Sequence, residues 1–176
     1  MRRGRSKRVG MPERCVPRGR RLGLLTVGVS LALAAAAGCG EPPAPSPEQQ
    51  AVFAQDVDAE VVVLAAPNAL RYATPVVEAP AGATVRLVMD NTETTSPAMV
   101  HNVVVVRTEA DVPRIGMAAR GDALPEDPAI LAATPMAAPR TQTAVVFTMP
   151  PPGRYPFFCS YPGHWQNMQG TLVSTP

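Results

Sequence analysis

The stretch Phe158-Cys-Ser-Tyr-Pro-Gly-His-Trp-Gln-Asn-Met-Gln-Gly170 places a thiol, an imidazole and a thioether within ten residues. These side chains belong to Cys159, His164 and Met168, and a second imidazole, His101, lies far upstream. Two histidines, one cysteine and a distant methionine are the ligand set of a mononuclear copper site that exchanges single electrons. The stretch therefore predicts such a site, and the fold has to bring the distant His101 next to it.

Each of these residues has an ordinary explanation when it is taken alone. A histidine near a strand end is usually a surface or core residue, Met168 is one of eight methionines, and Cys159 alone would pass for a small buried apolar residue. The combination is informative because the chain has only two histidines and both fall where such a site needs them. Pro162-Gly163 predicts a turn that brings His164 back toward Cys159.

The first 38 residues are typical of an export signal. They contain nine basic residues against one acid, and the uncharged run Leu22–Ala37 is shorter than the roughly 20 residues that span a bilayer. Ala36-Ala37-Gly38-Cys39 resembles the lipobox of bacterial lipoproteins, which implies cleavage before Cys39 and a lipid on its sulfur. Ordinary secretory cleavage nearby, leaving Cys39 as a free thiol, is the alternative.

Removing residues 1–38 reverses the sign of the net charge. The full chain has a formal charge of +2, whereas the remainder has seven arginines and thirteen acidic residues, a net charge of −6. The basic character belongs to the leader and gives no support for nucleic-acid binding. Cys159 is then the only thiol expected to be free in the folded part, and an unpaired thiol in an oxidising compartment needs burial or a metal to protect it.

The rest of the chain predicts an all-β Greek-key sandwich of seven to eight strands over residues 59–175. It follows a Pro-rich tether at residues 39–58, in which Gly40–Gln50 is expected to be extended. A continuous valine run after His101 favours a strand covered on both faces. The insertion (residues 108–141) is rich in Ala, Pro and acids, and one short helix is expected in it, at Pro128–Ala133. The expected strands are Glu60–Ala65, Arg71–Glu78 as an edge strand interrupted by Pro75, Thr84–Asp90, Asn102–Arg107, Thr143–Met149, Arg154–Cys159 and Gly170–Ser174.

The motif Cys159-x4-His164-x3-Met168, followed by Gly170 and preceded upstream by Met99-x-His101-Asn102, resembles the azurin and auracyanin branch of the cupredoxins. Phe158, Pro162-Gly163 and Gly170-Thr-Leu-Val match this branch as well. The resemblance implies one copper ion, cycling between Cu(I) and Cu(II), with His101, Cys159, His164 and Met168 as its ligands.

The same resemblance implies further roles. The backbone carbonyl of Val100 takes the position of a second axial contact, although azurins have glycine there, and Asn102 ties the two ligand-bearing segments together. The edge of His164 is the expected route for electrons through an apolar surface patch. Candidate residues for the rim of that patch are Pro97, Ala98, Pro162 and Trp165. For Trp165, a partly exposed packing residue is an equal alternative. The cysteine pair that staples the first strands of azurin is absent.

The leading hypothesis is an exported electron-transfer protein, lipid-anchored at the periplasmic or other extracytoplasmic face of a bacterial membrane. Its expected partners are redox proteins such as cytochromes or membrane oxidoreductases. A copper carrier or chaperone of the envelope is the alternative, but Met117, Met136 and Met149 are too scattered for a Met-rich motif. A copper enzyme is not expected, because no histidine remains for a second copper. A metal-free adhesive sandwich would leave the four ligand-type residues unexplained.

Overall fold

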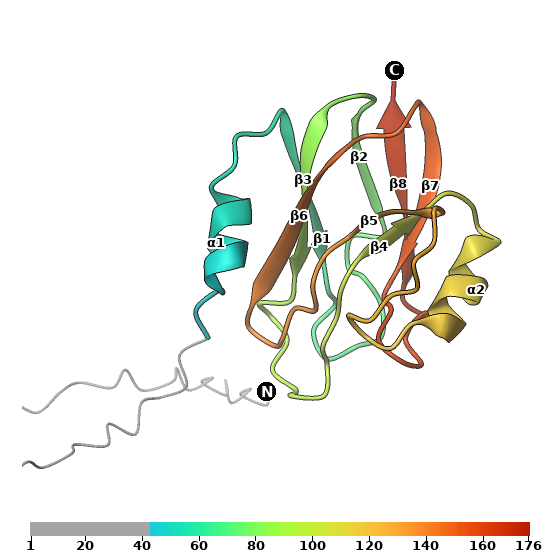
Figure 1. Cartoon of the computed structure of the whole chain (residues 1–176). Coiled ribbons are helices and arrows are strands. Elements are labelled where there is room, and N and C mark those ends of the chain that lie inside the picture. The colour runs from blue at the N-terminus through green and yellow to red at the C-terminus, as the bar shows by residue number, and fades with distance from the viewer. Residues whose placement is uncertain (1–42) are drawn as a thin grey trace, which may run out of the picture. The chain divides into compact units, whose positions relative to one another are not determined.

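Eight strands form two packed sheets in the part of the chain that the computed structural model describes, residues 43–176 (Figure 1). A three-stranded sheet has the order β1-β3-β6, and a five-stranded sheet has the order β2-β8-β7-β4-β5. The expected all-β sandwich is confirmed. The export signal predicted for residues 1–38 and the lipidation site Cys39 lie outside the described residues. Within residues 43–176, no helix is long and apolar enough to span a membrane.

Two helices and eight strands follow one another along residues 43–176. Their bounds are α1 Pro47–Phe53, β1 Ala59–Leu64, β2 Val76–Pro80, β3 Thr84–Asp90, β4 Val104–Val106, α2 Asp111–Ala118, β5 Ile130–Ala133, β6 Gln142–Thr148, β7 Gly153–Phe158 and β8 Gln169–Thr175. The expected edge strand Arg71–Glu78 starts only at Val76, since Pro75 cannot donate a ladder hydrogen bond. Before it, Tyr72 makes a single bridge to Ala65.

The valine run is buried on both faces, as its composition predicts. Val103 and Val105 belong to the main core between the two sheets. Val104 and Val106 face the other way and pack with Phe158 and residues of α2 in a second, smaller core. The segment that follows His101 is thus packed on both faces, and this packing fixes the position of the backbone at His101.

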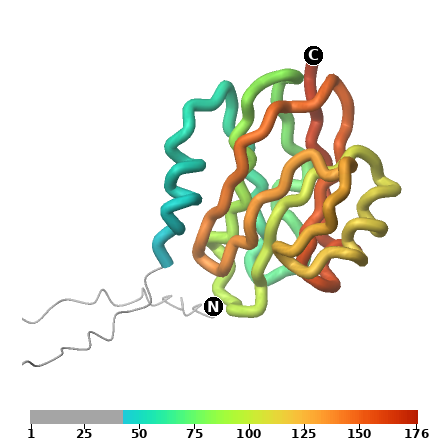
Figure 2. Tube along the Cα trace, viewed as in Figure 1, coloured from blue at the N-terminus to red at the C-terminus, as the bar shows by residue number. Residues whose placement is uncertain are grey.

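The insertion differs from its prediction in one respect. Pro128–Ala133 is not a helix: Ile130–Ala133 forms β5 and pairs antiparallel with β4. A helix of six residues would make few internal hydrogen bonds, whereas pairing with the edge of β4 satisfies the backbone groups of this segment. The helix lies earlier, at α2, whose Pro113 falls in the first turn, where proline is tolerated. In Figure 2 the insertion is the yellow to orange part of the tube, and α2 lies on the opposite side of the strands from α1.

The expected extended tether is also wrong for its last residues, because Pro47–Phe53 forms helix α1. The Ser46 side chain accepts a hydrogen bond from the Gln49 backbone N–H (3.2 Å), and Pro47 stands at the first helical position, so capping starts the helix. Gln49 is buried, and its amide pairs with the backbone of Ala144 in the edge strand β6: the Ala144 N–H donates to Oε1 at 2.7 Å, and Nε2 donates to the Ala144 carbonyl at 3.3 Å.

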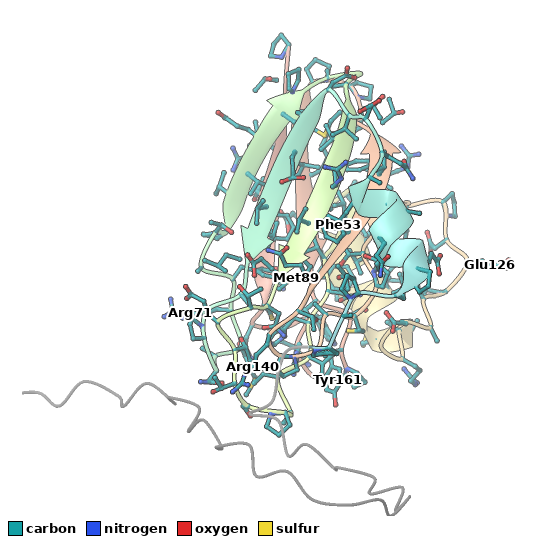
Figure 3. All side chains as sticks on the ribbon, turned by 90° about the vertical axis from the view of Figure 1, so that its left-hand side faces the viewer. Phe53, Arg71, Met89, Glu126, Arg140 and Tyr161 are labelled. Atoms are coloured by element: carbon teal, nitrogen blue, oxygen red, sulfur yellow. The ribbon has the colours of Figure 1, made fainter. Side chains whose placement is uncertain are left out.

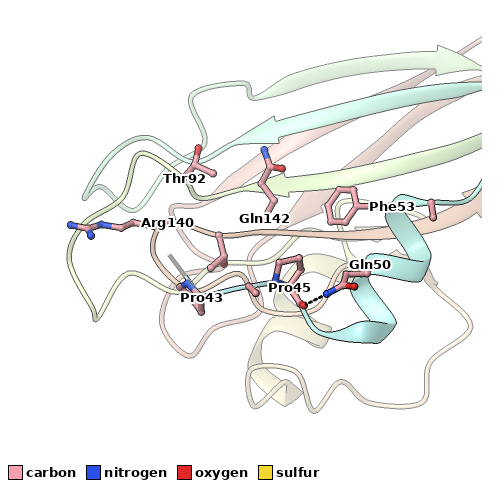
Figure 4. A pocket seen from close by; sticks show the side chains of 10 residues that line it. Pro43, Pro45, Gln50, Phe53, Thr92, Arg140 and Gln142 are labelled. Carbon is pink, nitrogen blue, oxygen red and sulfur yellow. Dashed lines mark hydrogen bonds between the residues drawn. The ribbon is translucent and has the colours of Figure 1, made fainter. Parts of the chain in front are cut away.

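A largely apolar cavity of about 690 Å³ lies where α1 meets the start of β6 (Figure 4). Its lining includes Pro43, Pro45, Phe53, Arg140 and Gln142, and the Gln50 side chain donates to the Pro45 carbonyl at 2.9 Å along its wall. None of the predicted metal ligands lines this cavity, so it is not the metal site.

Gly170, the glycine that ends the quoted stretch, leaves no room for a side chain. A Cβ at this position would lie 2.6 Å from the Pro75 carbonyl oxygen and would overlap the Phe157 ring. This close approach lets β8 run against both β7 and the chain before β2.

We expect Gly170→Ala to destabilise the protein by about 1–3 kcal/mol, the usual range for overpacking a filled core. Gly153→Ala is the matched control at the far end of the same strand pair, since its Cβ would meet Tyr155 at 3.4 Å or more, an ordinary contact. Urea unfolding of both variants measures the difference. Equal stabilities would contradict the packing described here.

Candidate metal centre

Three buried side chains from two distant segments meet at one point. Cys159 follows β7 directly, His164 lies in the loop between β7 and β8, and His101 lies 58 residues before Cys159 in sequence. The cysteine Sγ is 3.9 Å from Nδ1 of His101 and 3.6 Å from Nδ1 of His164. Their donor atoms all lie within 4.8 Å of one another. The structure therefore brings together three of the four predicted ligands around a common centre.

The ligand loop is shaped by its own backbone hydrogen bonds. Gly163 has a φ of +85°, which favours glycine, and the His164 N–H donates to the Tyr161 carbonyl at 2.9 Å. The Met168 N–H donates to the His164 carbonyl at 2.9 Å, and the Cys159 N–H donates to the Met168 carbonyl at 3.1 Å. These bonds close the loop, so that Met168 comes back beside Cys159.

Met168 is fully buried and belongs to the same core cluster as Cys159. Its role as a ligand stays a prediction, as does the axial contact of the Val100 carbonyl. Both residues belong to the segments that carry the other ligands, and Val100 precedes His101 in a partly exposed position.

Asn102 connects the two ligand-bearing segments through its side chain. Its Oδ1 accepts a hydrogen bond from the backbone N–H of Ser160 at 2.8 Å, and its Nδ2 donates to the Ser160 hydroxyl at 2.8 Å. The Thr134 hydroxyl accepts from the N–H of the next residue, Val103, at 3.0 Å. His101 itself is held by a two-way backbone bridge with Ala137, with hydrogen bonds of 3.2 and 2.7 Å.

Burial changes the acid–base properties of the thiol. It raises the pKa of Cys159 to about 11, while hydrogen bonds from the backbone N–H groups of Asn102 and Tyr161 act in the opposite direction. Burial, and then the charge of Cys159, also raise the pKa of Tyr72 well above its usual value. The Tyr72 hydroxyl donates to the Asn102 carbonyl at 2.6 Å, and its ring meets that of Phe157 edge-on. Without a cation the thiol stays protonated at neutral pH.

Both imidazoles are held in the neutral form. Burial, and then the charge of His164, lower the pKa of His101 to about 4, and burial lowers the pKa of His164 as well. The two rings lie 5.2 Å apart between centroids, and the Tyr161 ring covers His164 at 4.6 Å. Neutral imidazole is the form that binds metal ions.

The geometry fits a single metal ion. Metal bonds to imidazole nitrogen and thiolate sulfur are about 2.0–2.3 Å long, so two such donors about 110–120° apart on one ion lie about 3.5–3.7 Å from each other. The two sulfur–nitrogen distances of 3.6 and 3.9 Å are close to this value. One soft thiolate with two imidazoles matches the His₂Cys set of an electron-transfer copper site.

Comparison with known proteins agrees with this donor set. Residues 59–174 match the family model described as copper binding proteins, plastocyanin/azurin family. The chain belongs to the plastocyanin/azurin family. Copper is the metal of this family, and His101, Cys159 and His164 form the candidate ligand site of this member.

Auracyanins are among the proteins that resemble this chain. Auracyanin-B of Chloroflexus aurantiacus is 38% identical over 124 residues, which cover 66% of this chain and 52% of that protein, so the chain spans about half the length of this curated relative. The solved structure of auracyanin B has 34% identity and a TM-score of 0.62 over 69% of this chain and 92% of the other. Auracyanin A, a "blue" copper protein from the same bacterium, has 29% identity and a TM-score of 0.59 over 66% and 98%.

Several residues around the centre were not found from the sequence. Tyr161 covers His164, Tyr72 holds the Asn102 carbonyl, and Ser160 connects Cys159 to Asn102. For Ser160 and Tyr161, the position between Cys159 and His164 in the sequence could have indicated a place at the site. Tyr72 had no such signal, because nothing local relates it to Asn102. Of the predicted rim residues, Pro97, Ala98 and Pro162 are exposed and Trp165 is partly buried.

Because folded His101 stays neutral down to about pH 4, the metal-free protein should lose stability as the pH falls from about 6.5 to about 4. In this window the unfolded chain binds a proton that the folded protein excludes, and the loss should reach about 2–3 kcal/mol. Urea unfolding at several pH values measures it. The variant His101→Gln should show a shallower dependence on pH, and an unchanged slope would refute the assignment to His101.

Proposed function

We propose that this protein carries single electrons on one copper ion held by Cys159, His101 and His164, with Met168 as a weak fourth ligand. The observation that carries the proposal is the convergence of the three donor atoms within 4.8 Å in a buried site. A copper ion bound there supplies one-electron chemistry. The chain's own residues have to bind it, keep water away and hold the ligands still.

The structure supports each of these tasks. The Cys159 thiol, with its raised pKa, gives up its proton only in the presence of a cation, which ties the thiolate to the metal. The backbone bridge of His101 to Ala137 and the Asn102–Ser160 pair hold both segments before metal arrives. A preformed set of ligands that suits both copper oxidation states keeps rearrangement small, and electron transfer is then fast.

We further propose that electrons pass to partners through His164. It is buried but still 7% exposed, and the preceding residues Tyr161, Pro162 and Gly163 are all exposed. Figure 3 shows Tyr161 at the same end of the sandwich as Arg71 and Arg140. Expected partners are redox proteins such as cytochromes or membrane oxidoreductases.

The closed nature of the site favours an electron carrier over a copper carrier that hands its metal on. His101 and Cys159 are fully buried, and Met117, the most exposed of the scattered methionines, lies on α2 away from any Met-rich cluster. We propose no enzyme activity, because both histidines of the chain are used at this one site.

Copper-reconstituted protein should show an intense visible absorption that bleaches on reduction, and Cys159→Ser should abolish it because the thiolate is the source of the colour. Cys39→Ser in the full chain is the matched control, and it should keep the full absorption. Colour that survives in Cys159→Ser would refute the ligand assignment. Rapid loss of copper from the coloured protein to a chelator would favour the carrier function instead.

We also propose that the mature protein is exported and lipid-anchored through Cys39, with the Pro-rich segment before α1 as its tether. Cells expressing the full chain should incorporate labelled fatty acid into it, and Cys39→Ser should abolish the label while leaving copper binding intact. Secretion of an unlabelled, fully soluble wild-type protein would contradict the anchor.

A further inference from the structure

Helix α2 carries a glycine at the point where it meets the ligand loop. Gly116 is buried, and a Cβ built on it would lie 2.5 Å from Cγ and 2.9 Å from Cβ of Trp165. Trp165 packs against the second core, which includes Val112 and Ile115 of the same helix. The tryptophan therefore sits directly on the helix backbone, in a notch that only glycine leaves open.

Glycine at this position needs a reason, because it destabilises a helix interior by roughly 1 kcal/mol relative to alanine. Its backbone conformation gives none, since Gly116 is an ordinary helical residue. The Trp165 ring is what an alanine would displace. Glycine at position 116 thus lowers the stability of the helix but allows Trp165 to contact its backbone.

The insertion holds the ligand loop at a second point. The Ser160 hydroxyl donates at 2.7 Å to the carbonyl of Gly121, three residues after α2 ends. Gly121 has a φ of +70°, in a turn closed by backbone hydrogen bonds between Arg120 and Ala123. The residues that directly follow Cys159 and His164 are therefore held by α2 or by the turn behind it: Ser160 by the turn and Trp165 by the helix.

We propose that Trp165, seated on Gly116, is a positioning residue that fixes His164 at the metal centre. The proposal rests on the function proposed above and adds a role for the insertion. The backbone hydrogen bonds of His164 all stay within its own loop, whereas His101 is bridged to the distant residue Ala137. The contact of Trp165 with α2 holds His164 in place, as strand β7 holds Cys159, which directly follows it.

The experiment compares Gly116→Ala with Met117→Ala, a change at the neighbouring helical residue, which is 63% exposed and belongs to neither core. Trp165 is the only tryptophan of the chain, so the fluorescence of the metal-free protein directly reports how deeply this ring is buried. Gly116→Ala should move the emission to longer wavelength. It should also lower copper affinity by about tenfold, as loss of support for a metal ligand typically does, and change the ratio of the visible absorption bands. Met117→Ala should leave all three unchanged.

Trp165→Leu provides a second route that creates no clash. It should weaken copper binding and alter the band ratio in the same way, and adding Gly116→Ala to it should change little further, since both changes remove one contact. Wild-type affinity and band ratio in Trp165→Leu would overturn the positioning role, even if stability falls. A wild-type protein that binds copper without the visible band would instead overturn the proposed function, so the two failures are distinguishable.

Discussion

The burial of three side chains of the metal-ligand type, His101, Cys159 and His164, in one small volume is the constraint on which the rest of this structure depends. A thiol and two imidazoles excluded from water are costly to charge, and the displaced pKa values of Cys159 and His101 express that cost. A cation removes it, because it takes the thiolate and the neutral imidazoles as ligands. Burial of these three side chains is therefore unfavourable for their charged forms, and a bound metal ion compensates for this cost.

Two structural layers maintain this arrangement. The inner one is the sandwich, in which the valines of β4 pack into both cores and Asn102 joins the strand that follows His101 to Ser160. The outer one is the insertion, which contacts His101 through Ala137 and the ligand loop through Gly116 and Gly121. The insertion thus touches each part of the chain that carries a residue of the cluster His101, Cys159 and His164.

The sequence predicted correctly those features that depend on local residue spacing and side-chain chemistry. The spacing of Cys159, His164 and Met168 predicted the loop, and the valine run predicted a strand covered on both faces. It failed where a distant partner decides the conformation. Ile130–Ala133 is a strand because β4 lies beside it, and Pro47–Phe53 is a helix that docks on β6. The contacts of Tyr72 with Asn102 and of Trp165 with Gly116 exist only after folding, and no spacing rule encodes them.

The Gln49 side chain has a consequence for how the domain is delimited. By exchanging two hydrogen bonds with Ala144 it occupies part of the outer edge of β6, as an added strand would. The region shared with the family begins at residue 59 and so omits this helix. A fragment cut to that boundary would expose the β6 edge as a template for strand pairing between molecules. The short helix at the end of the tether thus covers part of this edge and packs with the folded domain, although family boundaries leave it out.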